Sequence, residues 1–81
     1  MIEVKLFASL REAVGSAAIS VDASHVKNVS DVIKILIEGD RKWSLLNEQN
    51  VLLAVNHELS ARDRKINDGD EIAFFPPVTG G

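Results

Sequence analysis

The sequence predicts an α+β roll, in which a mixed sheet is wrapped across one main helix. A strand-like alternation opens the chain, one amphipathic helical segment lies in its middle, and short apolar segments bounded by turn residues follow. Strands on both sides of one main helix are typical of a domain in which a sheet packs against that helix. The length of 81 residues indicates one domain.

The first third of the chain predicts two strands around a short helix. Segment 2–8 has apolar residues at its even positions, while its odd positions hold two charged residues and Phe7, which predicts a half-buried strand. Segment 9–12 has the spacing of a capping box, and Gly15 is placed to end a short helix. Segment 18–21 predicts a second short strand.

The main helix is predicted over residues 31–38. Ser30 and Asp31 provide a start signal, and Gly39 provides a stop. Its apolar residues form one stripe at helical spacing: Val32, Ile33, Leu36 and Ile37. The next segment, 41–47, indicates a short helical turn with buried apolar side chains.

The last third predicts two more strands, over 51–55 and 72–75. The dipeptide 56–57 is expected to turn the chain back toward Leu59, and segment 67–70 carries a strong turn signal. We expect the first and last strands to lie side by side at the centre of the sheet.

Composition and charge argue against several classes of protein. Because the chain has no cysteine, a disulfide scaffold, a cysteine-based zinc site and a thiol nucleophile are excluded, and a cytoplasmic location is expected. The net charge of −3 argues against a dedicated nucleic-acid binder. The longest unbroken apolar run is 51–55, so no membrane partner is expected, and the N-terminal segment predicts a strand and not a signal peptide.

No pattern of side chains predicts catalysis or a metal site. The phosphate-binding glycine motifs are absent, and His25 and His57 stand apart from any nucleophile, so we interpret both as surface or turn residues. Asp68, Asp70 and Glu71 lack the register of a calcium-binding loop and are interpreted as turn and solvation residues.

The C-terminal segment carries the strongest functional signal. It consists of Pro76, Pro77, Val78, Thr79, Gly80 and Gly81. The prolines favour an extended backbone, and the terminal glycines leave the carboxylate free to enter a narrow active site. Six residues reach about 20 Å when extended. We predict a domain over 1–75 with an extended tail over 76–81; a frayed chain end is the alternative.

With no catalytic side chain, the reactive group that remains is the Gly81 carboxylate. A free carboxylate is a poor acyl donor and must be activated, most simply by adenylation from ATP. An amine would then give an amide, and a sulfur donor would give a thiocarboxylate. A thiocarboxylate would let the chain deliver sulfur to a substrate bound by another protein.

An apolar patch is expected beside the tail. Phe7 lies on the strand face opposite the predicted core, and Leu59 and one of the two final phenylalanines could share that face. An exposed patch of this kind would mark a protein interface. A minor second core is the alternative, because periodicity alone does not separate the two.

Several segments resemble one family over the whole length of the chain. They are residues 4–8, residues 10–12 with Gly15, residues 53–56 and, most specifically, residues 68–81. These segments are similar to the ubiquitin-like sulfur carriers that form the small subunit of molybdopterin synthase. The resemblance implies a β-grasp fold.

The resemblance also implies a mechanism and partners. An adenylating enzyme of the ubiquitin-activating type would use ATP to adenylate Gly81, and a sulfurtransferase would supply the sulfur. The tail would insert into the large synthase subunit, within a heterotetramer, and two deliveries to cyclic pyranopterin monophosphate would make molybdopterin. No cofactor would be bound permanently. The chain would thus be the sulfur-donor subunit of an enzyme.

By the same resemblance, Phe7, Arg11, Leu59 and Phe75 match positions that face partner subunits.

Three alternatives to the sulfur-carrier function stay open. A thiamine-pathway sulfur carrier shares the fold and the terminal glycines. A ubiquitin-like modifier would use Gly81 to form isopeptide bonds. A plain binding module would leave the tail unexplained.

Overall fold

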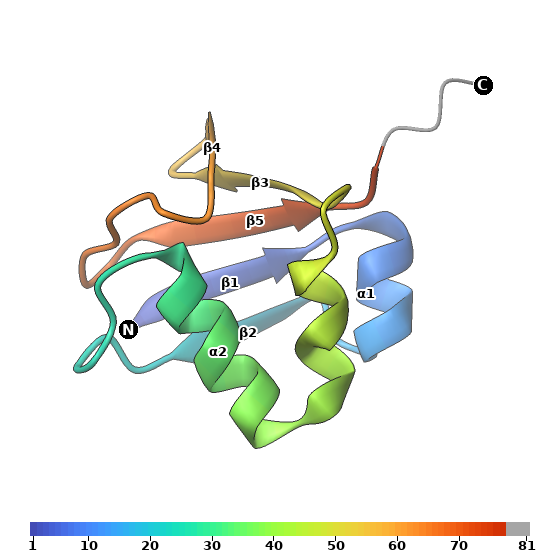
Figure 1. Ribbon diagram of the computed structural model, residues 1–81, viewed down its shortest axis with the longest axis horizontal. Helices are drawn as coiled ribbons and strands as arrows, with labels where there is room; N and C mark the ends of the chain where they lie inside the picture. Colours follow the sequence, from blue (N-terminus) through green and yellow to red (C-terminus); the bar gives the residue numbers. More distant parts are fainter. Residues whose placement is uncertain (78–81) are drawn as a thin grey trace.

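The computed structural model describes residues 1–77 and shows one mixed sheet with the main helix on one face (Figure 1). In chain order the elements are β1 (Ile2–Leu6), α1 (Ala8–Val14), β2 (Ala18–Val21), α2 (Val29–Gly39), the 3-10 helix η1 (Arg41–Asn47), β3 (Leu52–Val55), β4 (Glu58–Ser60) and β5 (Glu71–Phe75). None of the helices in residues 1–77 is long and apolar enough to cross a membrane.

The five strands are arranged in the order β2-β1-β5-β3-β4. The first and last strands lie side by side and run parallel, with Glu3 opposite Glu71 and Leu6 opposite Phe74. The other neighbouring strands are antiparallel. The last strand is therefore the middle one, and the predicted central pairing of the chain ends is confirmed.

The core lies between the sheet and the helices. Side chains buried on the covered face of the sheet include Ile2, Val4, Leu53, Val55, Ile72 and Phe74. The buried stripe of α2 consists of Val29, Val32, Ile33 and Leu36, and η1 adds Trp43 and Leu46. This arrangement confirms the predicted α+β roll and its β-grasp form, a mixed sheet packed on one main helix.

The main helix starts earlier than predicted. Asn28 is its N-cap, since the Asn28 Oδ1 atom accepts from the backbone N–H of Asp31 at 3.0 Å and Asp31 accepts from that of Asn28 at 3.3 Å. The predicted start signal, Ser30, has another role, because its hydroxyl donates to the carbonyl of Arg62 at 3.1 Å. The capping box of the main helix was not predicted and begins at Asn28, whereas the capping box predicted over 9–12 is absent, because the N-cap of the first helix is Phe7.

The predicted boundary between the first strand and the first helix is wrong. The strand ends at Leu6 and not at Ala8, and Phe7 occupies the N-cap of α1 without any side-chain capping bond. Ala8 has a φ of 51°, in the left-handed region, so the chain turns sharply out of β1 and Ser9 is already inside the helix. Gly15, with a φ of 78°, ends the helix as predicted.

The strand β3 is followed by a tight hairpin. Asn56 and His57 have φ values of 50° and 72°, and two consecutive positive φ values are the mark of a two-residue type I′ turn. The turn returns the chain toward Leu59 as predicted, and it adds the short strand β4, which sequence reasoning did not foresee.

Candidate functional site

The sheet has a second face, which we call the open face because α2 packs on the opposite side (Figure 1). Side chains of residues directly opposite each other in the strand register share a face. Leu52 is opposite Phe75, and Ala54 is opposite both Ala73 and Leu59. We define the open-face patch as Phe7, Leu52, Leu59 and Phe75.

The open-face patch is exposed and is not a second core. The exposed fractions are 42% for Phe7, 41% for Leu52 and 76% for Leu59, and Phe75 is half-buried. Phe74, the neighbour of Phe75, is fully buried on the covered face. The structure therefore places the predicted Phe7, Leu59 and Phe75 on one exposed surface, as an interface would require.

Two aromatic rings stack at the point where the tail leaves the sheet. The ring centroids of Phe7 and Phe75 are 4.9 Å apart, and the ring planes differ by 10°. The backbone N–H of Phe7 donates to the carbonyl of Phe74 at 3.2 Å, which ties the start of α1 to the end of β5. Pro76, next to this stack, is half-buried. The base of the tail is therefore firmly anchored.

The other end of the open face is polar. Glu71 accepts from Lys5 Nζ at 3.0 Å and lies 3.2 Å from His57 Nε2. The hydrogen bond from Lys5, followed by the charges of Lys5 and His57, lowers the pKa of Glu71 below its ordinary value. His57 is an exposed turn residue, as predicted. The open face is therefore charged at one end and apolar at the other end, beside the tail.

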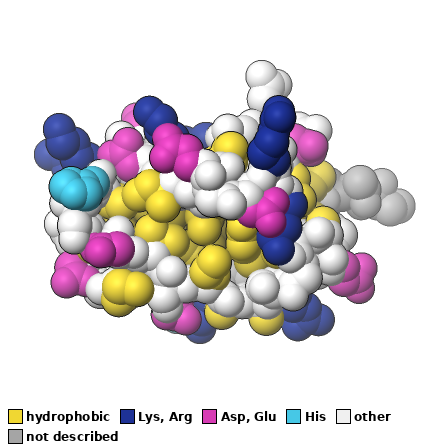
Figure 2. Space-filling view, turned by 90° about the horizontal axis from the view of Figure 1, so that it is seen from below, with side chains coloured by type: hydrophobic (Ala, Val, Ile, Leu, Met, Phe, Trp, Pro, Cys, Tyr) yellow, Lys and Arg dark blue, Asp and Glu magenta, His cyan; other side chains and the backbone are white. Residues whose placement is uncertain are grey.

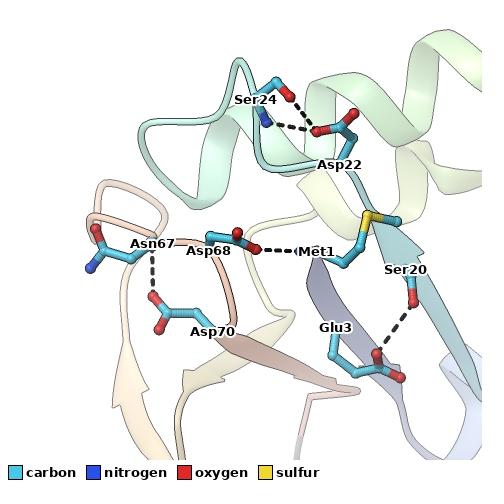
Figure 3. A network of polar contacts seen from close by, with 8 residues as sticks. All are labelled: Met1, Glu3, Ser20, Asp22, Ser24, Asn67, Asp68 and Asp70. Carbon is cyan, nitrogen blue, oxygen red and sulfur yellow. Dashed lines mark hydrogen bonds and ion pairs between the residues drawn. The ribbon is translucent and has the colours of Figure 1, made fainter.

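The acidic turn before β5 is held by its own side chains (Figure 3). Asp70 accepts from the side chain of Asn56 at 3.0 Å and from the backbone N–H of Asn67 at 2.7 Å, and these bonds, in that order, lower the pKa of Asp70. Asp68 pairs with the amino group of Met1. These contacts confirm the turn role of Asp70. Within residues 1–77, no three His, Cys, Asp or Glu side chains gather to hold a metal ion.

The remaining predicted site residues fall in two places. Arg11 is exposed on α1, four positions after Phe7. Pro77 is exposed at the end of the described segment, while Val78, Thr79, Gly80 and Gly81 lie outside the described residues. The structure therefore describes the base of the tail, up to Pro77, and the predictions for residues 78–81 stay predictions.

Sequence reasoning missed Leu52. Every residue from 51 to 55 is apolar, a pattern typical of a strand buried on both faces, and it hides the fact that Leu52 points outward. The signal that could have identified Leu52 is its even position in the strand, because Leu52 and Ala54 alternate with the buried Leu53 and Val55.

Comparisons with known proteins agree with this geometry. The ThiS family profile matches residues 4–81. The chain is 43% identical to the molybdopterin synthase sulfur carrier subunit of Escherichia coli K12, over the full length of both. It is 37% identical to small archaeal modifier protein 1 of Haloferax volcanii, covering 99% of this chain and all of that one.

A solved structure gives the same result for the fold. The crystal structure of SAMP1 from Haloferax volcanii superposes with a TM-score of 0.82 and 31% identity, covering 99% of this chain and 98% of that one. The resemblance to the sulfur-carrier subunits that the sequence predicts is therefore confirmed. The chain belongs to the ThiS family.

Proposed function

We propose that this chain is the sulfur-carrier subunit of a molybdopterin synthase and that Gly81 is its working end. The family and the full-length relatives that are named molybdopterin synthase sulfur carrier subunits support this function. The observation that carries the proposal is the Phe7–Phe75 stack, which continues the open-face patch directly into the base of the tail. A surface that docks on a partner would thereby aim the tail at the partner's active site.

The proposed chemistry begins with activation. The Gly81 carboxylate attacks the α-phosphorus of ATP, pyrophosphate leaves, and an acyl adenylate results. A persulfide sulfur supplied by a sulfurtransferase then attacks the acyl carbon and displaces AMP, which leaves an acyl disulfide. A thiol of the sulfurtransferase system cleaves its S–S bond, which releases the thiocarboxylate on this chain and leaves a disulfide on the donor. The adenylating enzyme supplies the nucleotide site, so this chain needs no cofactor of its own.

Sulfur delivery follows on a second partner. The open-face patch docks on the large synthase subunit, and the extended tail, Pro76 to Gly81, carries the thiocarboxylate to cyclic pyranopterin monophosphate bound there. Two deliveries supply the two sulfur atoms of the dithiolene, which fits a heterotetramer with two carrier chains. The absence of cysteine suits this role, because no thiol within the chain can capture the activated end.

Protein modification is a second candidate function. It is supported by the 37% identity to small archaeal modifier protein 1 and by the close superposition of SAMP1. In that role a lysine amine, and not a sulfur donor, would attack the Gly81 adenylate. Both roles use the same patch and the same carboxylate, so they differ only in the nucleophile. A thiamine-pathway sulfur carrier is a third role with the same first step.

The test is reconstitution with the adenylating enzyme, ATP, a sulfur donor and the large subunit. Deletion of Gly81 should leave the thermal melt unchanged, since the domain ends at β5, but it should abolish pyrophosphate release and molybdopterin formation. The carboxylate would lie about 3.5 Å short, and even about 1 Å of misplacement costs on the order of a hundredfold in rate. Lys34→Gln, an exposed change on α2, is the matched control and should behave as wild type.

Intact mass of the protein purified from its own cells separates the roles. A gain equal to the mass difference between sulfur and oxygen marks a thiocarboxylate, whereas high-mass conjugates mark a modifier. Wild-type rates of both reactions with the Gly81 deletion would show that the carrier mechanism is wrong.

A further inference from the structure

A second surface lies at the other edge of the sheet, away from the open-face patch. It is a groove of about 440 Å³ between β2, the C-terminal half of α2 and the start of η1. Its apolar lining includes Ile19, Ile35, Leu36 and Trp43. Figure 2, which looks at the molecule from the side of α2 and η1, shows hydrophobic side chains gathered at the centre of this side with charged side chains around them.

The strand that borders this groove has a free edge. Within residues 1–77, β2 pairs only with β1. The N–H of Leu6 donates to the carbonyl of Ala17 at 2.9 Å, and hydrogen-bonded pairs alternate along an antiparallel ladder, so Ile19 and Val21 are the next β2 residues that bond to β1. The backbone groups of Ala18 and Ser20 therefore face outward.

Such an edge selects the kind of ligand. An extended peptide can pair its own N–H and C=O groups with those of Ala18 and Ser20, and alternate side chains would then point to the same side as Ile19, into the groove. Ile35 is 37% exposed there, which leaves apolar surface for such side chains to cover. A small molecule or a helix would not use the outward backbone groups, which would stay bonded to water.

The charged residues of the groove indicate which residue should flank the apolar segment of the ligand. Asp22 follows β2 directly and accepts from the N–H and the hydroxyl of Ser24 at 2.8 and 2.5 Å, which hold its pKa below the ordinary value (Figure 3). Asp40 already has Lys42, whose Nζ lies 4.0 Å away. Within residues 1–77, Asp22 has no ion-pair partner. A lysine or arginine on the ligand would provide one.

We propose that this groove binds an extended apolar segment of a partner protein, flanked by a basic residue at Asp22, which adds a sixth strand beside β2. The interaction goes beyond the sulfur-carrier function and does not depend on it. The two surfaces can be occupied together, because β1 separates β2 from β5 and from the tail that follows it. The chain could therefore be held by one protein through its edge while another works on its C-terminus.

The chain contains its own reporter for this site. Trp43 is the only tryptophan and there is no tyrosine, so fluorescence excited at the red edge of protein absorption comes from the groove alone. The probe is a capped peptide, Lys-Val-Ile-Val-Ile-Lys, titrated into the full chain. We expect a saturable change in Trp43 emission and amide shift changes in β2 and along the groove side of α2, with the amides of the open-face patch unmoved.

A matched pair of variants tests the backbone contact. Ser20→Pro removes one outward N–H, and an edge strand tolerates proline at a position that does not bond to its neighbour. Ser20→Ala loses the same side chain and keeps the N–H. We expect Ser20→Pro to bind the peptide about tenfold more weakly than Ser20→Ala. Should Ser20→Pro fail to fold, Ile35→Lys, which places a charge in the groove, should weaken binding by a similar factor.

The charge contact has its own test. Asp22→Asn should weaken the peptide with lysine ends and should not affect a peptide with glutamine ends. Equal affinity of Ser20→Pro and Ser20→Ala, or shifts that map to the open-face patch, would overturn the proposal. So would a concentration-dependent dimer, seen by light scattering and abolished by Ser20→Pro, because the occupant would then be a second copy of this chain.

Discussion

The two faces of the sheet are made of the same strands, but one is buried and the other is exposed. On the covered face, residues such as Ile2, Val4 and Phe74 are completely buried under α2. On the open face, Phe7, Leu52 and Leu59 keep two-fifths or more of their surface exposed. Burial of apolar area is the main favourable term in both folding and association. The covered face uses this burial to fold the chain, whereas the apolar area of the open face stays exposed and available for association.

Two adjacent residues in β5 show this division most clearly. Phe74→Ala should destabilise the fold by about 3–5 kcal/mol as a truncation in a closed core, which lowers Tm by at least about 12 °C in a domain of this size. Phe75→Ala loses a half-buried ring and its stack on Phe7 and should cost only about 1–2 kcal/mol. Thermal and chemical denaturation of both variants measures the difference. Equal losses would mean that the open face is a second core.

The patch should matter for association more than for stability. We expect Phe7→Ala to weaken binding to the large synthase subunit by about thirtyfold, the effect of an interface hot spot. Leu59→Lys should also weaken binding, yet change stability by no more than about 0.5 kcal/mol, since its side chain is almost free. Titration calorimetry measures the affinities, with Lys34→Gln as the control on the opposite side. Unchanged affinity in both patch variants would show that another surface docks.

The left-handed Ala8 lies at the junction of the two faces. An L-residue in this conformation costs roughly 1–2 kcal/mol, whereas glycine adds back about 0.5–1 kcal/mol through the unfolded chain. Ala8→Gly should therefore be neutral or stabilise the fold by up to about 1.5 kcal/mol. Ala8→Val, with a branched side chain at the same φ, should destabilise it. Denaturant unfolding checks both. Stabilisation by valine would contradict the observed backbone.

The smallest expected effect concerns pH. The pKa of Glu71 is lowered in the fold, chiefly by the hydrogen bond from Lys5, so its contribution to stability is complete above the ordinary value of 4.5 and is lost as pH falls through the folded pKa. Glu71→Gln should make the decline of Tm between about pH 5 and about pH 3 shallower. Part of the slope should remain, because the pKa values of Asp22 and Asp70 are lowered too. Identical slopes for the variant and the wild type would contradict this assignment.

The elements that depend on the spacing of apolar residues and on turn-forming residues were predictable from the sequence. The alternation in segment 2–8 indicates that Phe7 and the core residues lie on opposite faces, and the stripe from Val32 to Ile37 identifies the main helix. Gly15 ends α1 because its φ of 78° suits glycine, which is a property of the residue itself. Such features depend on local chemistry, so the sequence alone reveals them.

Features that depend on tertiary context were not predictable. Sequence offers Ser30 as a helix start, but the carbonyl of Arg62, far along the chain, engages its hydroxyl, so Asn28 becomes the cap. Leu52 is hidden in an apolar run because the sequence does not say which face of β3 lacks a cover. The role of Arg11 came from the resemblance alone. The role of Gly81 came from elimination of other chemistry and stays a prediction.

The parallel pairing of β1 with β5 has a consequence for how the molecule folds. Glu3 faces Glu71, so this contact closes a loop of 68 residues (71 minus 3), whereas β1 with β2, through α1, and β3 with β4, through a tight turn, pair over short separations. Long loops are slow to close, so these local strand pairs should form early and β5 should join them last. The Phe7–Phe75 stack at the base of the tail would then form only when the whole sheet is complete. If the open-face patch docks on partners as proposed, folding itself would decide which chains can be used, because a partly folded chain presents no complete patch.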